Sequence, residues 1–197
     1  WERNMYFEET GLDFLPPSPN IPTPDTALAY IGTGLLEGVN VSEGRGTTQP
    51  FRTIGAPWVD GFQLARELNE AGLRGVKFCP CYFTPTFSKY EGEHCEGIRI
   101  QIRDKHSIEP FRMGVAVLCS LYGNYEEFSF LPPHKAGGKS SFDLLAGTEE
   151  LRVAIQNGNA DTFLEDTDSR LADFERIRGK YILYGESTKE NILPYNI

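Results

Sequence analysis

The sequence predicts an α+β fold with more helices than strands. Two observations support this prediction. Strict alternation of apolar and polar residues over 97–103 is typical of a half-buried antiparallel strand. The other strand-like segments are not regularly separated by helices, as a doubly wound sheet would require. With 197 residues, 40% of them hydrophobic, the chain is long enough to fold as one domain, or one domain and part of another.

The first helix is expected at residues 26–36. Thr23 is suited to the N-cap position, Pro24 to the first helical position and Asp25 to the positive end of the helix dipole. The run 16–24 is rich in proline and is expected to be a loop, as is the Gly- and Ser-rich stretch 37–50. The predicted buried face of the helix consists of apolar residues at three- and four-residue spacing: Leu28, Ile31 and Leu35.

The rest of the chain is expected to alternate irregularly between helices and strands. A helix at 60–71, ended by Gly72, has apolar residues at Phe62, Leu64, Ala65 and Leu68. Strands are expected at 76–83 and 97–103, where Ile98, Ile100 and Ile102 share one face. Further helices are expected at 110–121, 142–145, 149–156 and 169–178, and a last strand at 181–184.

Charge and hydropathy exclude two classes of function. Nineteen Lys and Arg stand against 28 Asp and Glu, which gives a formal net charge of −9 and a pI of about 4.9. General binding to the phosphate backbone of nucleic acids needs clustered cations, so we expect no nucleic-acid partner. No apolar run reaches the roughly 18 residues that a transmembrane helix needs, so we expect no membrane span.

The four cysteines allow three interpretations. The one-residue spacer in Cys79-Pro80-Cys81 is poor for zinc, whose paired ligands usually lie two to four residues apart, so we expect no metal site. A disulfide between Cys95 and either Cys79 or Cys81 is the better prediction if the protein is exported. We favour a third interpretation, in which most of the four are buried thiols, including Cys119 in an apolar helix.

The densest group of reactive side chains lies in the stretch 36–48. Two carboxylates, Glu37 and Glu43, flank a Gly-rich loop that also contains Arg45. Paired carboxylates suit glycoside hydrolysis, and the arginine suits an anionic substrate. A turn with a surface ion pair is the alternative, at about even weight. The stretch lacks the Gly-Lys-Ser/Thr ending of a phosphate loop, and Gly32-x-Gly34 is a weak match to a dinucleotide fingerprint, so we expect no cofactor.

Two further groups of residues have weaker patterns. The aromatic segment 82–90 suits stacking on sugar rings, although loop packing explains it equally well. His94, His106 and His134 have no nucleophile motif near them and are expected on the surface or in loops.

Five runs of residues together resemble one family of bacterial proteins. In order along the chain they are Ser18-Pro19-Asn20-x-Pro22; Leu36-Glu37-Gly38-x-Asn40-x-Ser42-Glu43-Gly44-Arg45-Gly46-Thr47-x-x-Pro50-Phe51; Gly55-Ala56-Pro57-Trp58; Phe83-x-Pro85-Thr86-Phe87-Ser88-Lys89-Tyr90; and Cys95-x-Gly97. The chain resembles the family long labelled DUF1343 from residue 1 to about residue 184. The second run is the most specific of the five.

The resemblance implies a domain organisation. Members of the family are about twice as long as this chain, with an N-terminal Rossmann-like domain that carries most of the catalytic cleft and a smaller C-terminal auxiliary domain. Residues 1–50 therefore resemble the last segment of the Rossmann-like domain, and residues 51–197 an auxiliary α+β domain. The absent N-terminal half is then a partner of this chain, and we expect the chain alone to be inactive.

The resemblance also implies an activity, the hydrolysis of non-reducing terminal N-acetylmuramic acid from peptidoglycan fragments by a secreted or periplasmic enzyme. Glu37 and Glu43 match the specific motif and are the candidate catalytic residues, although a second catalytic group can lie in the absent half. The candidate substrate-binding residues are Ser18, Asn20, Asn40, Ser42, Arg45, Thr47, Lys89 and Tyr90, with Arg45 a candidate clamp for the lactyl carboxylate. The alternative function is a non-catalytic module that binds cell-wall glycan.

Overall fold

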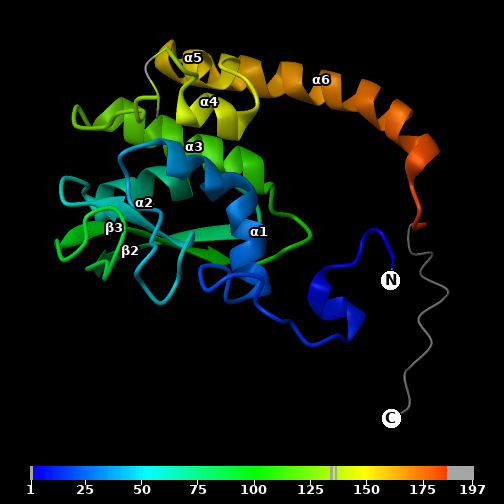
Figure 1. The fold of residues 1–197 in the computed structure, drawn as a ribbon, viewed down its shortest axis with the longest axis horizontal. Coiled ribbons are helices and arrows are strands. Elements are labelled where there is room, and N and C mark those ends of the chain that lie inside the picture. The colour runs from blue at the N-terminus through cyan, green and yellow to red at the C-terminus, as the bar shows by residue number, and fades with distance from the viewer. Residues whose placement is uncertain (1, 134, 136, 186–197) are drawn as a thin grey trace.

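The computed structural model describes residues 2–133, 135 and 137–185, so the expectation for His134 lies outside the described residues. Helices and strands follow one another as expected for a mixed α+β fold, which is confirmed (Figure 1). In chain order they are η1 (Phe7–Thr10), α1 (Pro24–Thr33), η2 (Gly34–Gly38), β1 (Thr53–Ala56), α2 (Gly61–Glu70), β2 (Val76–Phe83), β3 (Cys95–Ile102), α3 (Pro110–Asn124), α4 (Ser141–Ala146), α5 (Glu150–Gln156), α6 (Ala160–Arg178) and η3 (Gly179–Tyr181). None of the helices in these ranges is long and apolar enough to cross a membrane.

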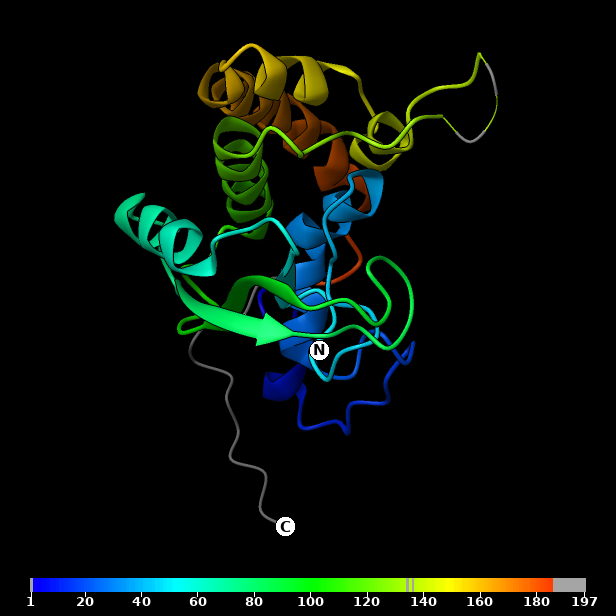
Figure 2. The same cartoon turned by 90° about the vertical axis from the view of Figure 1, so that its left-hand side faces the viewer.

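The described strands form a three-stranded antiparallel sheet in the order β1-β3-β2. Ile98 and Ile100 of β3 are fully buried on the predicted face, and Ile100 lies opposite Phe78 of β2. The helix α2 packs on β2 and β3, and α3 lies above the same side of the sheet (Figures 1 and 2). The other face of the sheet therefore carries Arg99 and Gln101, as the alternation predicted.

The helix α1 begins as predicted and buries a different face. Thr23 accepts a hydrogen bond from the backbone N–H of Thr26, and Pro24 is the first helical residue. The prediction that Ile31 is buried is wrong, because its side chain is 59% exposed. The side that packs on α3 consists of small residues, and a Cβ at Gly32 would lie only 1.9 Å from the carbonyl oxygen of Pro110. Close approach of the two backbones thus selects small side chains over large apolar ones.

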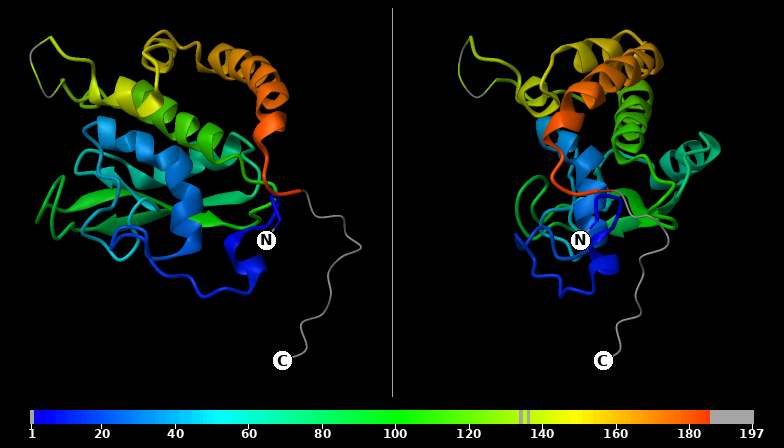
Figure 3. Two further views of the ribbon diagram at one scale, coloured as in Figure 1. Left: turned by 45° about the vertical axis from the view of Figure 1, so that its right-hand side comes forward. Right: turned by 90° about the vertical axis from the view of Figure 1, so that its right-hand side faces the viewer.

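The other helix predictions differ from the structure mainly in their boundaries. In α2, Leu64, Ala65 and Leu68 are buried as expected, whereas Phe62 is 62% exposed. The helix predicted at 169–178 begins nine residues earlier, at Ala160, because Ala160 and Leu164 pack against the core. The strand predicted at 181–184 is wrong: η3 ends at Tyr181, and no strand follows within the described residues. Figures 1 and 3 show the second half of α6 extending beyond the end of α3.

The predicted disulfide is wrong, because all four cysteines are free thiols. In the register of the sheet, Cys95 lies opposite Phe83, and Cys81 lies opposite Gly97, so neither candidate partner faces Cys95 directly. Cys95 is buried, and Cys79, Cys81 and Cys119 are partly buried. Burial raises the pKa of both Cys95 and Cys119 to about 11. The preferred interpretation, that most of the four thiols are buried, is confirmed for Cys95 alone.

One apolar core crosses the predicted boundary at residue 50. Leu35, Leu36, Val39 and Val41 belong to the same cluster of buried side chains as the sheet and α3. The assignment of residues 1–50 to a separate domain stays a prediction. The N-terminal segment turns back toward the end of α6, where the backbone N–H of Arg3 donates to the carbonyl oxygen of Gly185 (3.0 Å).

Candidate functional site

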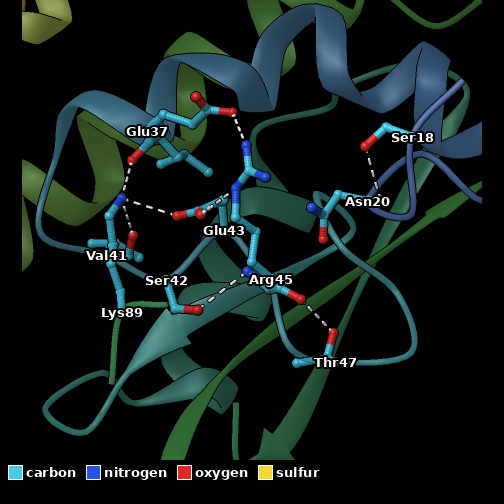
Figure 4. A network of polar contacts seen from close by, with 11 residues as sticks. Ser18, Asn20, Glu37, Val41, Ser42, Glu43, Arg45, Thr47 and Lys89 are labelled. Atoms are coloured by element: carbon cyan, nitrogen blue, oxygen red, sulfur yellow. Dashed lines mark hydrogen bonds and ion pairs between the residues drawn. The ribbon is translucent and has the colours of Figure 1, made fainter. Parts of the chain in front are cut away.

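The stretch after η2 forms a loop in which Arg45 bridges the two candidate carboxylates. Its Nη2 donates to Oε1 of Glu37 at 2.6 Å, and its Nε lies 3.0 Å from Oε1 of Glu43 (Figure 4). The guanidinium also stacks over the ring of Phe51, 5.0 Å from its centroid. The structure therefore brings Glu37, Glu43 and Arg45 together, with the arginine between the two acids.

Lys89 completes this network from a loop far along the chain. Its Nζ donates to Oε2 of Glu43 (2.9 Å) and to the carbonyl oxygens of Leu36 (2.7 Å) and Val41 (3.1 Å). All three ammonium protons are thus used within the protein. Burial lowers the pKa of Lys89, and the nearby Glu43 carboxylate opposes that shift. We refer to Glu37, Glu43, Arg45 and Lys89 as the Arg45 network, in which two carboxylates balance two cations.

The two carboxylates differ in exposure. The side chain of Glu43 is 3% exposed and both of its oxygens are ion-paired, one to Arg45 and one to Lys89. The side chain of Glu37 is 28% exposed, and within the described residues its Oε2 has no hydrogen-bond partner. Only Glu37 therefore has a carboxylate oxygen free to contact a substrate.

The glycines of the motif allow close packing of the protein on itself. Gly44 has φ of +80°, and a Cβ there would lie 2.4 Å from the carbonyl oxygen of Thr53. Gly46 has φ of +78°, and a Cβ there would lie 2.7 Å from the backbone nitrogens of Thr86 and Phe87. The fold of the loop therefore requires glycine at both positions, because any side chain there would meet the backbone of a neighbouring segment.

Asn40 and Ser42 fix the same loop to its neighbours. The side-chain amide of Asn40 donates to the carbonyl oxygen of Glu127 and accepts from the backbone N–H of Ser129. Ser42 is buried; its backbone pairs with Gly55 of β1, and its Oγ accepts from the N–H of Gly44. Both side chains thus have a structural use within the chain.

Tyr90 joins the loop to Trp58, a residue that was not among the candidate site residues. Its hydroxyl donates to the carbonyl oxygen of Asn40 (2.7 Å) and accepts from Nε1 of Trp58 (3.2 Å). Burial raises the pKa of the Tyr90 hydroxyl. The signal that could have found Trp58 and Phe51 is their place in the motif runs, next to the loop residues that they support.

The remaining candidates lie at the edge of the network. The Oγ of Ser18 accepts from the N–H of Asn20, and Figure 4 draws both residues on the side of Arg45 away from Lys89. The hydroxyl of Thr47 donates to the carbonyl oxygen of Gly44 and accepts from the N–H of Gln49. None of these three side chains bonds to the Arg45 network within the described part of the chain.

His94 and His106, the two histidines that the structure describes, do not take part in the network. Nδ1 of His94 lies 3.0 Å from Oγ1 of Thr84, and Nε2 of His106 lies 3.0 Å from Oε1 of Glu9. Both histidines are exposed, as predicted.

Comparison with known proteins identifies the family. Residues 28–184 match the family described as exo-β-N-acetylmuramidase NamZ, C-terminal. The chain belongs to this family. Over 186 residues it is 40% identical to peptidoglycan β-N-acetylmuramidase NamZ of Bacillus subtilis strain 168, an alignment that covers 93% of this chain and 44% of that protein.

Two solved structures from Bacteroides fragilis NCTC 9343 have a similar fold. Both belong to DUF1343 family proteins, which confirms the resemblance seen in the sequence. One superposes with a TM-score of 0.81 at 30% identity, over 93% of this chain and 48% of the other. The second has a TM-score of 0.60 at 26% identity, over 87% of this chain and 44% of the other. The chain thus spans less than half the length of these relatives.

Proposed function

We propose that this chain forms one wall of the active site of a peptidoglycan β-N-acetylmuramidase, with Glu37 and Arg45 facing the saccharide. Membership of the NamZ C-terminal family and 40% identity to a peptidoglycan β-N-acetylmuramidase support the reaction class. The observation that carries the residue assignment is the partly exposed carboxylate of Glu37, held at one oxygen by Arg45 and free at the other.

Glu37 is the candidate acid or base in this proposal. Hydrolysis of a glycosidic bond needs a carboxyl group that gives a proton to the leaving oxygen or takes one from water. Arg45 fixes the orientation of Glu37 through Oε1, so that Oε2 can exchange a proton with the substrate. Glu43 is a positioning residue, because its buried carboxylate holds Arg45 and Lys89 and has no free oxygen.

Arg45 is the candidate contact for the lactyl carboxylate of N-acetylmuramic acid. Its Nε and Nη2 are occupied by the two glutamates, while its Nη1 has no hydrogen bond within the described residues. With a side chain that is 29% exposed, Arg45 can donate from this nitrogen to an anionic group of a ligand. Ser18 and Asn20 are candidate contacts for the sugar hydroxyls.

The other wall of the active site is proposed to come from a further domain of the intact protein. The relatives are more than twice as long as the matched segment, and the pocket of about 760 Å³ beside α2 and α3 does not include Glu37 or Arg45. In this proposal residues 1–50 are the last segment of a Rossmann-like domain that supplies the second catalytic group. A peptidoglycan substrate further suggests a secreted or periplasmic location.

The test is release of N-acetylmuramic acid from a chromogenic muramic glycoside by the intact protein that contains this chain. We expect Glu37→Gln to lower kcat by about 10²-fold or more, the scale on which general acid–base catalysis contributes. The matched control is Glu91→Gln, which changes an exposed carboxylate with no ion pair among the described residues. Unchanged kcat in Glu37→Gln would remove Glu37 as acid or base.

The same experiment distinguishes the alternative function. If the intact protein binds muropeptides and releases no sugar, it is a non-catalytic glycan-binding module. If it neither binds nor hydrolyses them, both functions are wrong.

A further inference from the structure

A further pocket lies on the face of the sheet opposite α2. It has a volume of about 600 Å³, within the range of about 300–1,000 Å³ for small-molecule sites. Five threonines, three aromatic residues, Gly46 and Arg99 line it. The side chain of Phe87 is 47% exposed there, whereas Thr53 at the base is 1% exposed.

Arg99 enters this pocket without a partner from the protein. Within the described residues its guanidinium has neither a hydrogen bond nor an ion pair, and its Nε is buried and unsatisfied. Other partly buried arginines of the chain, Arg45 and Arg152, each contact a carboxylate. Leaving a buried donor unsatisfied costs about 1–3 kcal/mol, and more for a charged group.

A further polar atom beside Arg99 is also unsatisfied. Thr53 lies opposite Arg99 in the sheet register, and its Oγ1 is buried without a hydrogen-bond partner. Unsatisfied polar atoms of Arg99 and Thr53 thus lie side by side in the lining of one pocket, where a polar ligand could bond to them.

The charges on this face favour an anion. In the strand register Lys77 lies opposite Gln101, and Arg103 donates to Oε1 of Gln101. The face therefore carries Lys77, Arg99 and Arg103, although the whole chain has a formal net charge of −9. A planar guanidinium in such a place matches the geometry of a carboxylate.

We propose that this pocket binds the carboxylate of a further N-acetylmuramyl residue of the glycan, beyond the terminal residue assigned to Arg45, with Arg99 as its ion-pair partner and Phe87 against the sugar ring. The choice of saccharide rests on the proposed function, whereas the preference for a carboxylate rests on Arg99. The loop around Gly46 joins the two sites, since Arg45 belongs to the network and the next three residues line the pocket.

The test compares binding of N-acetylmuramic acid and N-acetylglucosamine, which lacks the lactyl carboxylate. Binding to the intact protein is measured by calorimetry, with Arg45→Gln beside Arg99→Gln so that the two candidate carboxylate contacts are measured separately. For N-acetylmuramic acid we expect Arg99→Gln to weaken binding by roughly 10-fold or more, the effect of losing a hydrogen bond to a charged group. Arg99→Lys keeps the charge and should recover part of that loss, and Phe87→Ala should weaken the binding of both sugars.

Arg74→Gln is the control, because it removes an arginine whose side chain is 72% exposed. The proposal is wrong if Arg99→Gln binds N-acetylmuramic acid as tightly as the unchanged protein, if the two sugars bind equally well, or if neither binds. The failure of this proposal can be distinguished from the failure of the proposed function. If Glu37→Gln loses activity while Arg99→Gln binds the sugar unchanged, only the proposed Arg99 pocket is contradicted. Carboxylate-dependent binding at Arg99 without sugar release contradicts only the hydrolase.

Discussion

The ammonium nitrogen of Lys89 lies 2.9 Å from Oε2 of Glu43, a carboxylate whose side chain is 3% exposed. This buried ion pair joins two loops that are 46 residues apart in the sequence. Because Lys89 also donates to the carbonyl oxygens of Leu36 in η2 and Val41 in the Glu43 loop, it holds the backbone and the carboxylate at once. Its main effect is therefore on the shape of the loop that presents Glu37 and Arg45.

Lys89→Met is expected to destabilise the protein, because it leaves Glu43 buried with one oxygen unpaired. Removing one partner of a buried pair costs about 3–5 kcal/mol. Urea unfolding of the intact protein measures the change. Lys77→Met, which removes an exposed lysine of β2, is the control and should change stability by less than about 0.5 kcal/mol. Equal stability of the two variants would show that the pair does not hold the loop.

Arg45→Lys is expected to lower activity more than stability. Arg45 reaches Glu37 and Glu43 with two different nitrogens, and a lysine has one nitrogen to offer. The loss of a hydrogen bond to a charged group corresponds to a fall in kcat/KM of roughly 10- to 100-fold. Release of N-acetylmuramic acid by the intact protein measures it, with Arg74→Lys as control. An unchanged kcat/KM would contradict the role given to the bridge.

The sequence predicted those helices and strands that carry a clear local signal, such as a helix cap or an alternating apolar pattern. Thr23 and Pro24 fix the start of α1 because a cap and a proline ring act within a few residues. The alternating run of β3 gave the buried face of the sheet. By contrast, β1 was missed: Ser42 and β3 cover its two edges and all four of its residues are buried, so Thr53–Ala56 shows no alternation.

The sequence was enough to locate the candidate site in one loop, but not to assign a role to each of its charged residues. The run 36–47 contains both glutamates and Arg45, and its pattern is enough to indicate the family. Which glutamate is exposed depends on Lys89, and the glycine positions depend on Thr53. These contacts form only in the folded chain, so residue spacing cannot reveal them.

Gly44→Ala is expected to cost more stability than Gly92→Ala. The two glycines have similar φ angles, +80° and +76°, and an L-residue in this region costs about 1–2 kcal/mol. A Cβ at Gly92 would meet nothing within 4 Å, whereas one at Gly44 would clash with Thr53. The clash should add about 1–3 kcal/mol. Equal urea midpoints for the two variants would mean that the close approach does not constrain residue 44.

The stability of the protein is expected to fall between about pH 9 and pH 11 through Cys95. Burial raises the pKa of this thiol from 9.0 to about 11, so in this range the unfolded chain loses a proton that the folded chain keeps. The contribution of Cys95 is therefore complete below about pH 9 and is lost as the pH rises through the folded pKa. The complete loss should be roughly 2–3 kcal/mol, since the two pKa values differ by about two units and one unit corresponds to about 1.4 kcal/mol.

The measurement compares the unchanged protein with Cys95→Ala by urea unfolding across this range, in the presence of a reducing agent. The variant lacks the thiol, so the difference in unfolding free energy isolates Cys95 from the tyrosines that titrate nearby. We expect the difference to decline as the pH rises, and the same decline with Cys119→Ala, because burial also raises the pKa of Cys119 to about 11. Parallel pH curves for the protein and Cys95→Ala would contradict the raised pKa and the burial of this thiol.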